Sequence, residues 1–285
     1  MKTQLHTSHD SGFVPRRLAW ANRQSWVAAL CAAVGFGCAS PQPQRVNAPE
    51  SKRLDELSQE VKGIDERLQK IETLLADILE EEREPDPAEV YAVPIEGDPY
   101  SGAEHAKVTL VEAFEFACPY CAQSWATIQQ LLADYAGDIK VVYKYYVVHQ
   151  EAVAAGLAAC AAHQQGKFTP MTELIWEKAF AEGDLGVPKL ETLAEEASLN
   201  LETYRKDLES DTCISWLRRN YGELEGLGVN GTPAFYVNGR YLSGAQPIEN
   251  FKKLIDEELA KANTSGIPAE SYYQKAVLEA GKAKL

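Results

Sequence analysis

The residues best suited to chemistry are two cysteines, Cys118 and Cys121, separated by Pro119 and Tyr120. Thiols at this spacing can exchange disulfides, because one thiolate attacks a disulfide and the other resolves the mixed disulfide that results. Half of a zinc site and a purely structural disulfide are the alternatives. Zinc needs two further ligands, and no other cysteine of the chain has a second cysteine two residues away. We therefore expect thiol–disulfide chemistry at this motif, with no metal.

The elements around the motif are predicted to place Cys118 at the start of a helix. Residues 108–116 (VTLVEAFEF) are mostly apolar, β-branched or aromatic, which predicts a buried strand, and a helical pattern follows over 120–135. Pro119 suits the first helical position. The unpaired N–H groups and dipole of a helix N-terminus stabilise an anion, so we expect a lowered pKa for Cys118. Cys121 should lie one turn further in, close to Cys118 but shielded.

The rest of the globular part predicts an α/β fold with a mixed sheet and flanking helices. A second strand is expected over 139–148, a block of helices over 151–227, a hairpin around Asn238-Gly239 and a closing helix over 248–261. The domain should cover residues 90–262, and a polar tail with a possible short helix, 263–285, should follow it. A formal net charge of -14 argues against nucleic acid as a partner, because phosphate binding needs clustered Lys and Arg.

The N-terminal residues 1–37 resemble an export signal, with Arg16, Arg17 and Arg23 ahead of a short apolar run. The run ends at Gly37-Cys38, which is similar to a bacterial lipoprotein processing site with Cys38 as the lipid-bearing residue. Ordinary cleaved secretion and an uncleaved anchor remain open, because the usual Leu three residues before the cysteine is Gly35 here. We expect an exported protein of the periplasm or cell envelope, tethered through Cys38, with residues 38–50 as a spacer.

Residues 51–84 contain a heptad repeat that predicts a coiled-coil stalk. Apolar residues alternate spacings of three and four at Leu54, Leu57, Val61, Ile64, Leu68, Ile71, Leu75 and Ile78. Leu at most a positions with Ile at most d positions favours more than two strands, so we expect a homo-oligomer, with a trimer preferred. A helix packed on its own domain is the alternative.

Four segments together resemble the DsbA-like family of the thioredoxin fold. They are VEAFEFACPYC, AACAAHQQGKF, GLGVNGTPAFYVNG and the closing helix, and the resemblance covers about residues 91–262. It implies a thioredoxin fold with a helical insertion over 151–227, preceded here by the coiled-coil helix. It also implies a cis Thr232–Pro233 bond beside Cys118, with substrate contacts from Pro119, Tyr120, Thr232 and Pro233.

The resemblance also suggests roles for other side chains. Glu112 stands where the family often has a buried acid, which would accept the proton of Cys121. His149 closes the second strand and is interpreted as structural. Cys160 and Cys213 stand where some relatives carry a second cysteine pair, so a structural disulfide is expected, with two buried free thiols as the alternative.

The sequence therefore predicts an exported thiol–disulfide oxidoreductase without a cofactor. Its partners would be proteins with thiols or disulfides and a redox protein that resets the active site. Oxidation, reduction and isomerisation use the same exchange, so its direction is open. A lipid-anchored envelope scaffold, whose thioredoxin-like domain only binds a partner, is the competing interpretation.

Overall fold

The computed structural model describes residues 48–81 and 84–285. The predicted signal segment 1–37, the lipidation site Cys38 and most of the spacer lie outside the described residues. Within the described part, no helix is both long and apolar enough to cross a bilayer.

Helix α1 (Ala48–Glu81) contains the predicted heptad stretch. It is a single helix of 34 residues and begins three residues before the expected stalk. Its heptad side chains are about half exposed in the single chain, from 48% for Leu57 to 57% for Leu54. The apolar stripe is therefore open to solvent along the described part of the heptad.

The domain is built on a mixed five-stranded sheet with the strand order β1-β3-β2-β4-β5. Only the pairing of β2 with β3 is parallel, and the other three pairings are antiparallel. The strands are β1 (Tyr100–Gly102), β2 (Val108–Phe114), β3 (Ile139–Tyr145), β4 (Ala234–Val237) and β5 (Arg240–Ser243). β2 is central and buried throughout, and Asn238 and Gly239 form the β4–β5 turn with positive φ angles of 46° and 82°. The α/β fold class is confirmed.

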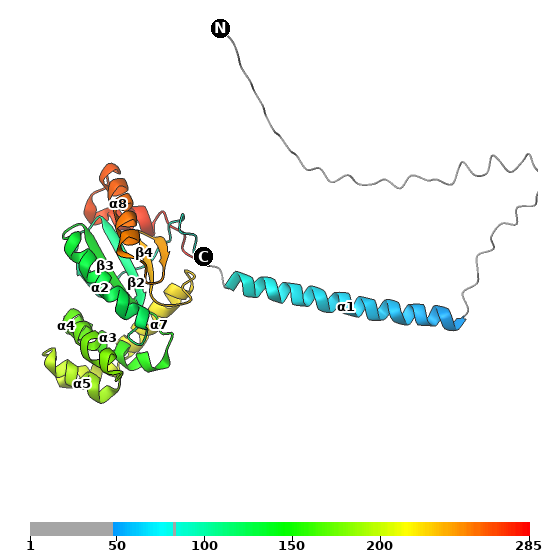
Figure 1. Ribbon diagram of the computed structural model, residues 1–285, viewed down its shortest axis with the longest axis horizontal. Coiled ribbons are helices and arrows are strands. Elements are labelled where there is room, and N and C mark those ends of the chain that lie inside the picture. Colours follow the sequence, from blue (N-terminus) through cyan, green and yellow to red (C-terminus); the bar gives the residue numbers. More distant parts are fainter. Residues whose placement is uncertain (1–47, 82–83) are drawn as a thin grey trace, which may run out of the picture. The chain divides into compact units, whose positions relative to one another are not determined.

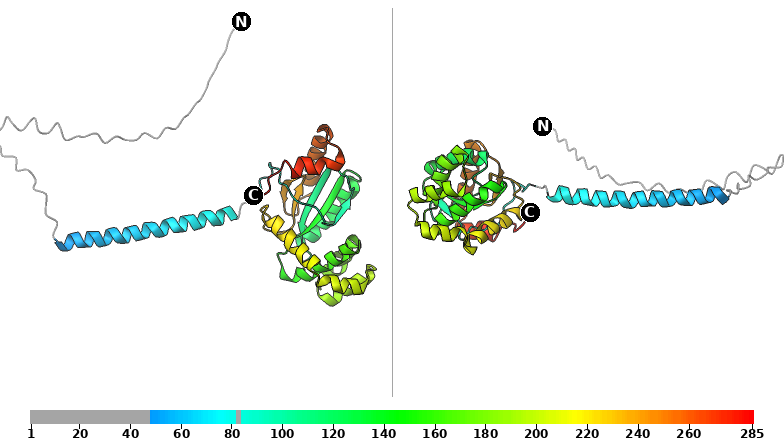
Figure 2. Two further views of the ribbon diagram at one scale, coloured as in Figure 1. Left: turned by 180° about the vertical axis from the view of Figure 1, so that it is seen from behind. Right: turned by 90° about the horizontal axis from the view of Figure 1, so that it is seen from below.

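Helices cover the sheet and form a second lobe beyond one of its ends (Figure 1 and Figure 2). Helices α2 (Pro119–Asp134) and α8 (Ile248–Thr264) pack on each other and on the strands. The second lobe is the expected insertion between β3 and β4. It consists of η1 (Gln150–Ala152), α3 (Val153–Gln164), α4 (Phe168–Leu174), η2 (Ile175–Phe180), α5 (Val187–Glu196), α6 (Leu201–Leu208) and α7 (Asp211–Glu225).

Two cysteines bind the insertion together. Cys160 on α3 and Cys213 on α7 form a disulfide with an S–S distance of 2.06 Å and a Cα–Cα distance of 5.6 Å. Both side chains are buried. The bond joins the first long helix of the insertion to its last helix, which returns the chain to the sheet.

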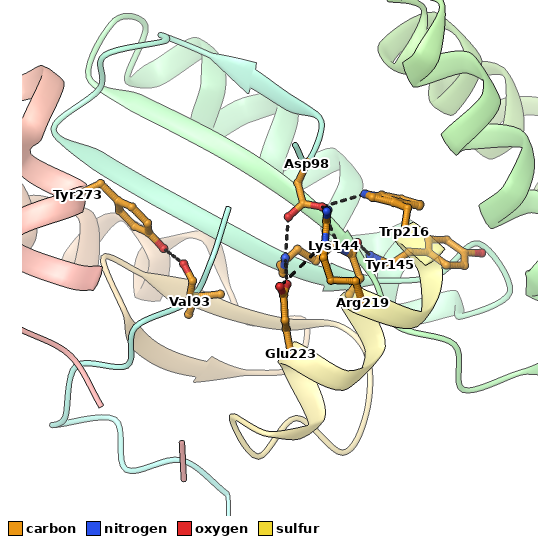
Figure 3. A network of polar contacts seen from close by, with 9 residues as sticks. Val93, Asp98, Lys144, Tyr145, Trp216, Arg219, Glu223 and Tyr273 are labelled. Atoms are coloured by element: carbon orange, nitrogen blue, oxygen red, sulfur yellow. Dashed lines mark hydrogen bonds and ion pairs between the residues drawn. The ribbon is translucent and has the colours of Figure 1, made fainter. Parts of the chain in front are cut away.

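A buried charged network fixes α7 against β3 (Figure 3). Lys144 is fully buried, and its Nζ lies 2.6 Å from both Asp98 and Glu223. Asp98 Oδ1 also accepts hydrogen bonds from the side chains of Trp216, Arg219 and Asn220. Three segments that are distant in the sequence are thus joined through two buried charges.

The same network extends through Tyr145, at the end of β3, to the segment between β2 and the Cys118–Cys121 motif. The backbone N–H of Tyr145 donates to Asn220 Oδ1 at 2.9 Å, and the Tyr145 hydroxyl donates to Ala152 O at 2.7 Å. The backbone N–H of Phe116, two residues before Cys118, donates to the same hydroxyl at 3.3 Å. Tyr145 therefore links the segment before the motif to the start of the insertion.

The C-terminal residues extend the packed domain beyond the expected boundary at 262. Helices α9 (Ala269–Tyr273) and η3 (Gln274–Leu278) bury Tyr272, Tyr273 and Val277. The Tyr273 hydroxyl donates to Val93 O at 2.9 Å, and Lys282 N donates to Val90 O at 2.8 Å. The aromatic and aliphatic side chains within this mostly polar segment explain why it packs on the domain.

Candidate active site

The end of β2 and the start of α2 position the two thiols. Cys118 is the N-cap of α2, with extended dihedral angles (φ -81°, ψ 119°), and Pro119 is the first helical residue. The backbone N–H groups of Cys121 and Ala122 donate to the Cys118 carbonyl at 3.1 and 3.2 Å. Both thiols are free in this structure, and Cys121, on the inner face of the helix, is only 1% exposed.

The loop before β4 meets Cys118 from the other side. The Thr232–Pro233 peptide bond is cis, and the Cys118 thiol donates to the backbone carbonyl of Thr232 at an Sγ···O distance of 3.3 Å. Pro233 is buried and Thr232 half-buried, while Pro119 is exposed and Tyr120 is 62% exposed. The structure therefore brings Thr232 next to Cys118, and an exposed aromatic ring stands in the motif itself.

The surroundings drive the two thiol pKa values in opposite directions. The hydrogen bond with Cys121 is the largest cause that lowers the pKa of Cys118, to about 5, and burial partly opposes it. The Thr232 side chain and the backbone of Cys121 and Tyr120 lower it further. Burial raises the pKa of Cys121 far above its usual range. The two shifts favour ionisation of Cys118 over ionisation of Cys121.

Glu112 lies beneath this pair on the central strand, level with Tyr143 of β3 and Phe235 of β4. It is 2% exposed, and burial raises its pKa to about 8, partly offset by a hydrogen bond from Ser124. The Ser124 hydroxyl lies 3.0 Å from Glu112 Oε1 and 3.0 Å from the Cys121 carbonyl. The charge of Glu112 is one of the causes that raise the pKa of Cys121, so the acid and the inner thiol interact.

Ser124 and Glu115 are the neighbours of the motif to which the sequence assigned no role. Ser124 follows Cys121 by three residues and so shares its inner helix face, which is the signal that could have identified it. Glu115 follows β2 and is fully buried, where it accepts hydrogen bonds from the backbone N–H groups of Val148 and His149 and contacts the His149 ring.

No cluster of three or more potential metal-ligating side chains occurs among residues 48–81 and 84–285. Cys160 and Cys213 are bonded to each other and lie in the insertion, apart from the two free thiols. The side chains gathered at the motif are thus two thiols, a buried acid and a serine hydroxyl, a set suited to moving protons and exchanging disulfides.

Comparisons with known proteins agree with this arrangement. A family model described as thioredoxin matches residues 95–257, more than half of the chain. A thioredoxin-like oxidoreductase from Silicibacter pomeroyi DSS-3 is 27% identical, with a TM-score of 0.52, over 56% of this chain and 91% of that one. BdbD from Bacillus subtilis is 21% identical, with a TM-score of 0.56, and the match covers 62% of this chain and 100% of BdbD. Proteus mirabilis ScsC is 21% identical, with a TM-score of 0.53, and the match covers 76% of this chain and 98% of ScsC.

The chain also matches one part of several longer curated proteins. The Na(+)/H(+) antiporter NhaA of Herminiimonas arsenicoxydans is 28% identical over 172 residues, which are 60% of this chain and 27% of the antiporter. An NhaA of Salinispora tropica is 32% identical over 168 residues, or 25% of its length. The chain spans about a quarter of these relatives, and the greater part of each antiporter lies outside the match.

Fold and site together define the class as a thioredoxin-fold protein with a dithiol centre at a helix start. The chain belongs to the thioredoxin family. Within that fold, this chain carries a helical insertion between β3 and β4 and a Cys-Pro-Tyr-Cys motif at the start of α2.

Proposed function

We propose that this chain is an exported thiol–disulfide oxidoreductase that acts on the cysteines of other proteins. The observation that carries the proposal is the geometry of the motif: two free thiols at the start of α2, with Cys118 as the N-cap beside the Thr232 carbonyl and Cys121 buried. The surroundings lower the pKa of Cys118 and raise that of Cys121. A low pKa supplies the attacking thiolate, and a high one keeps the second thiol protonated until it is needed.

In the reducing direction, the Cys118 thiolate attacks one sulfur of a substrate disulfide. The substrate S–S bond breaks, its second sulfur leaves as a thiolate, and a mixed disulfide with Cys118 forms. Cys121 then gives its proton to the ionised form of Glu112 and attacks the Cys118 sulfur. This step releases the reduced substrate and leaves a Cys118–Cys121 disulfide for a redox partner to reduce. Oxidation of a substrate is the same sequence reversed.

Substrate is proposed to bind across the motif and the loop before β4. Tyr120 and Pro119 present exposed side chains, and the Thr232–Pro233 backbone lies beside Cys118. An extended peptide could pair with this backbone in the manner of strand addition. Such contacts use main-chain atoms, so they suit a protein with many different substrates.

The lowered pKa of Cys118 favours an oxidising reduction potential. A stabilised thiolate stabilises the reduced dithiol, which makes the disulfide form a stronger oxidant. An oxidising potential suits both an oxidase and an isomerase, so the potential does not separate the two roles. The number of active sites in one assembly does. Several sites facing one misfolded substrate suit an isomerase.

The stalk residues 51–84 are proposed to assemble the chain into a trimer. Support comes from the half-exposed heptad stripe of α1 and from the Leu and Ile distribution described above. Fully burying one such side chain contributes ~1.5–3 kcal/mol, so a second and third copy of the chain are suitable partners.

Export and attachment to the membrane through Cys38 complete the proposal. They rest on the basic and apolar residues of 1–37 and on the Gly37-Cys38 junction. The alternative, an anchored scaffold that only binds, would not need a lowered thiol pKa at Cys118 or a buried acid below it.

The test is a disulfide-exchange assay with the full chain. Reduction of insulin and repair of scrambled ribonuclease should both occur in glutathione buffer, and Cys118→Ala should abolish both. Deleting residues 51–84 should preserve insulin reduction but impair ribonuclease repair. Binding of substrate proteins without any exchange would instead favour the scaffold.

A further inference from the structure

Glu115 and His149 form a polar pair next to the motif that the proposed exchange steps do not use. The Glu115 side chain is fully buried, whereas the His149 ring is 46% exposed. Glu115 Oε2 accepts the backbone N–H groups of Val148 at 2.8 Å and His149 at 3.0 Å, and Oε1 contacts His149 Nδ1. Three hydrogen bonds from the loop after β3 thus converge on one carboxyl group.

The position of Glu115 makes its charge relevant to Cys118. It lies three residues before Cys118, and its backbone partly offsets the rise in the pKa of Cys121. Its two oxygens face two backbone N–H groups and a ring nitrogen, so the carboxyl group acts as a hydrogen-bond acceptor in this structure. A buried anion so close to the motif opposes formation of a second anion on Cys118, unless a positive charge compensates it.

His149 can supply that compensation. Glu115 raises the pKa of His149, and smaller contributions come from Glu151 and from the Cys118 thiolate. Interactions between titrating groups are reciprocal, so a thiolate that favours the imidazolium is itself favoured by it. The groups that act on His149 are therefore one buried acid, one acid of η1 and the attacking sulfur.

We propose that His149 is a positioning residue whose positive charge, held by Glu115, controls how readily Cys118 ionises. The inference rests on the proposed function of the Cys118–Cys121 pair. While His149 is protonated, its positive charge offsets the effect of the Glu115 negative charge on Cys118. Once His149 loses its proton, the Glu115 anion acts on Cys118 unopposed, and the reduced form of the enzyme loses stability.

Four variants of the full chain separate this role from a structural one. His149→Asn removes the charge but keeps a side chain that can hydrogen-bond, and His149→Lys restores the charge without the ring. Glu115→Gln removes the negative charge but keeps a side chain of nearly the same size and shape. His105→Asn, in an exposed loop before β2, is the matched control.

The measurement is the rate of Cys118 alkylation by iodoacetamide against pH, read on the Cys118 peptide by mass spectrometry. His149→Asn should raise the midpoint by ~0.5 pH unit, the size of a partly screened charge interaction, and Glu115→Gln should lower it by a similar amount. His149→Lys and His105→Asn should match the wild type. A shift of ~0.5 unit is about threefold in equilibrium constant, or ~15 mV in reduction potential.

An unchanged midpoint in His149→Asn would overturn the inference, and so would shifts of the same sign in His149→Asn and Glu115→Gln. Insulin reduction by the wild type is measured in parallel. If the wild type exchanges no disulfides while the midpoints shift as expected, the proposed function fails and the electrostatic role stands.

Discussion

Replacing Glu112 by Gln should make the domain more stable, by an amount that grows with pH. Folding raises the pKa of Glu112 from 4.5 to about 8, because the side chain is buried. The folded state therefore favours the protonated acid. Stability is unaffected below pH 4.5 and falls as the pH rises toward 8, where the unfolded chain ionises and the folded chain does not.

The size of the effect follows from the two pKa values. Each unit corresponds to about 1.4 kcal/mol, so the cost of Glu112 is about 3 kcal/mol at pH 7 and about 5 kcal/mol above pH 8. Glu112→Gln keeps the shape and an oxygen that can accept the hydrogen bond of Ser124. Its free energy of unfolding should exceed that of the wild type by these amounts.

Urea unfolding of both reduced proteins between pH 4.5 and 9 measures the difference. A difference that does not change with pH would refute the assigned burial cost. The variant should also slow the release of substrate from the mixed disulfide, because Cys121 loses its proton acceptor. In the wild type this rate should rise with pH up to about 8, and in Glu112→Gln this rise should disappear.

Three further predictions concern stability and assembly. Asp98→Ala leaves the buried Lys144 without one partner and should destabilise the domain by ~3–5 kcal/mol in urea unfolding; a loss below ~1 kcal/mol would contradict the role of the network. Replacing both Cys160 and Cys213 by Ala should cost ~4 kcal/mol by the same assay, since the bond closes a loop of 53 residues; an unchanged urea midpoint would show that the bond contributes nothing. Light scattering of the full chain should give a trimer and, without residues 51–84, a monomer; a monomeric full chain would exclude the stalk.

The sequence was most informative where the signals were local. The run 108–116 before Cys118 identified the central strand, and Asn238-Gly239 identified the hairpin, because each depends on a few adjacent residues. The family resemblance located Pro233 and the pairing of Cys160 with Cys213, which spacing alone could not decide.

The charged network was not predictable from the sequence. Asp98, Lys144 and Glu223 are far apart along the chain, and a lysine within an apolar strand has no local signal that names its partners. The C-terminal residues were expected to be a polar tail with a possible short helix, because the segment 263–285 is rich in polar residues, and nothing local indicated that Tyr273 would be buried. The burial of Lys144 and Tyr273 depends on contacts with residues that are distant in the sequence, and these contacts form only in the folded chain.

The most direct test of the account is the capture of mixed disulfides by single-cysteine variants. Cys121→Ala leaves the attacking thiolate without its resolving partner, so it should accumulate covalent complexes with substrate proteins that dithiothreitol releases. Cys118→Ala should capture none, because burial holds the remaining Cys121 thiol in its protonated form. Equal capture by the two variants, or by neither, would contradict the assignment of Cys118 as nucleophile and Cys121 as resolving thiol.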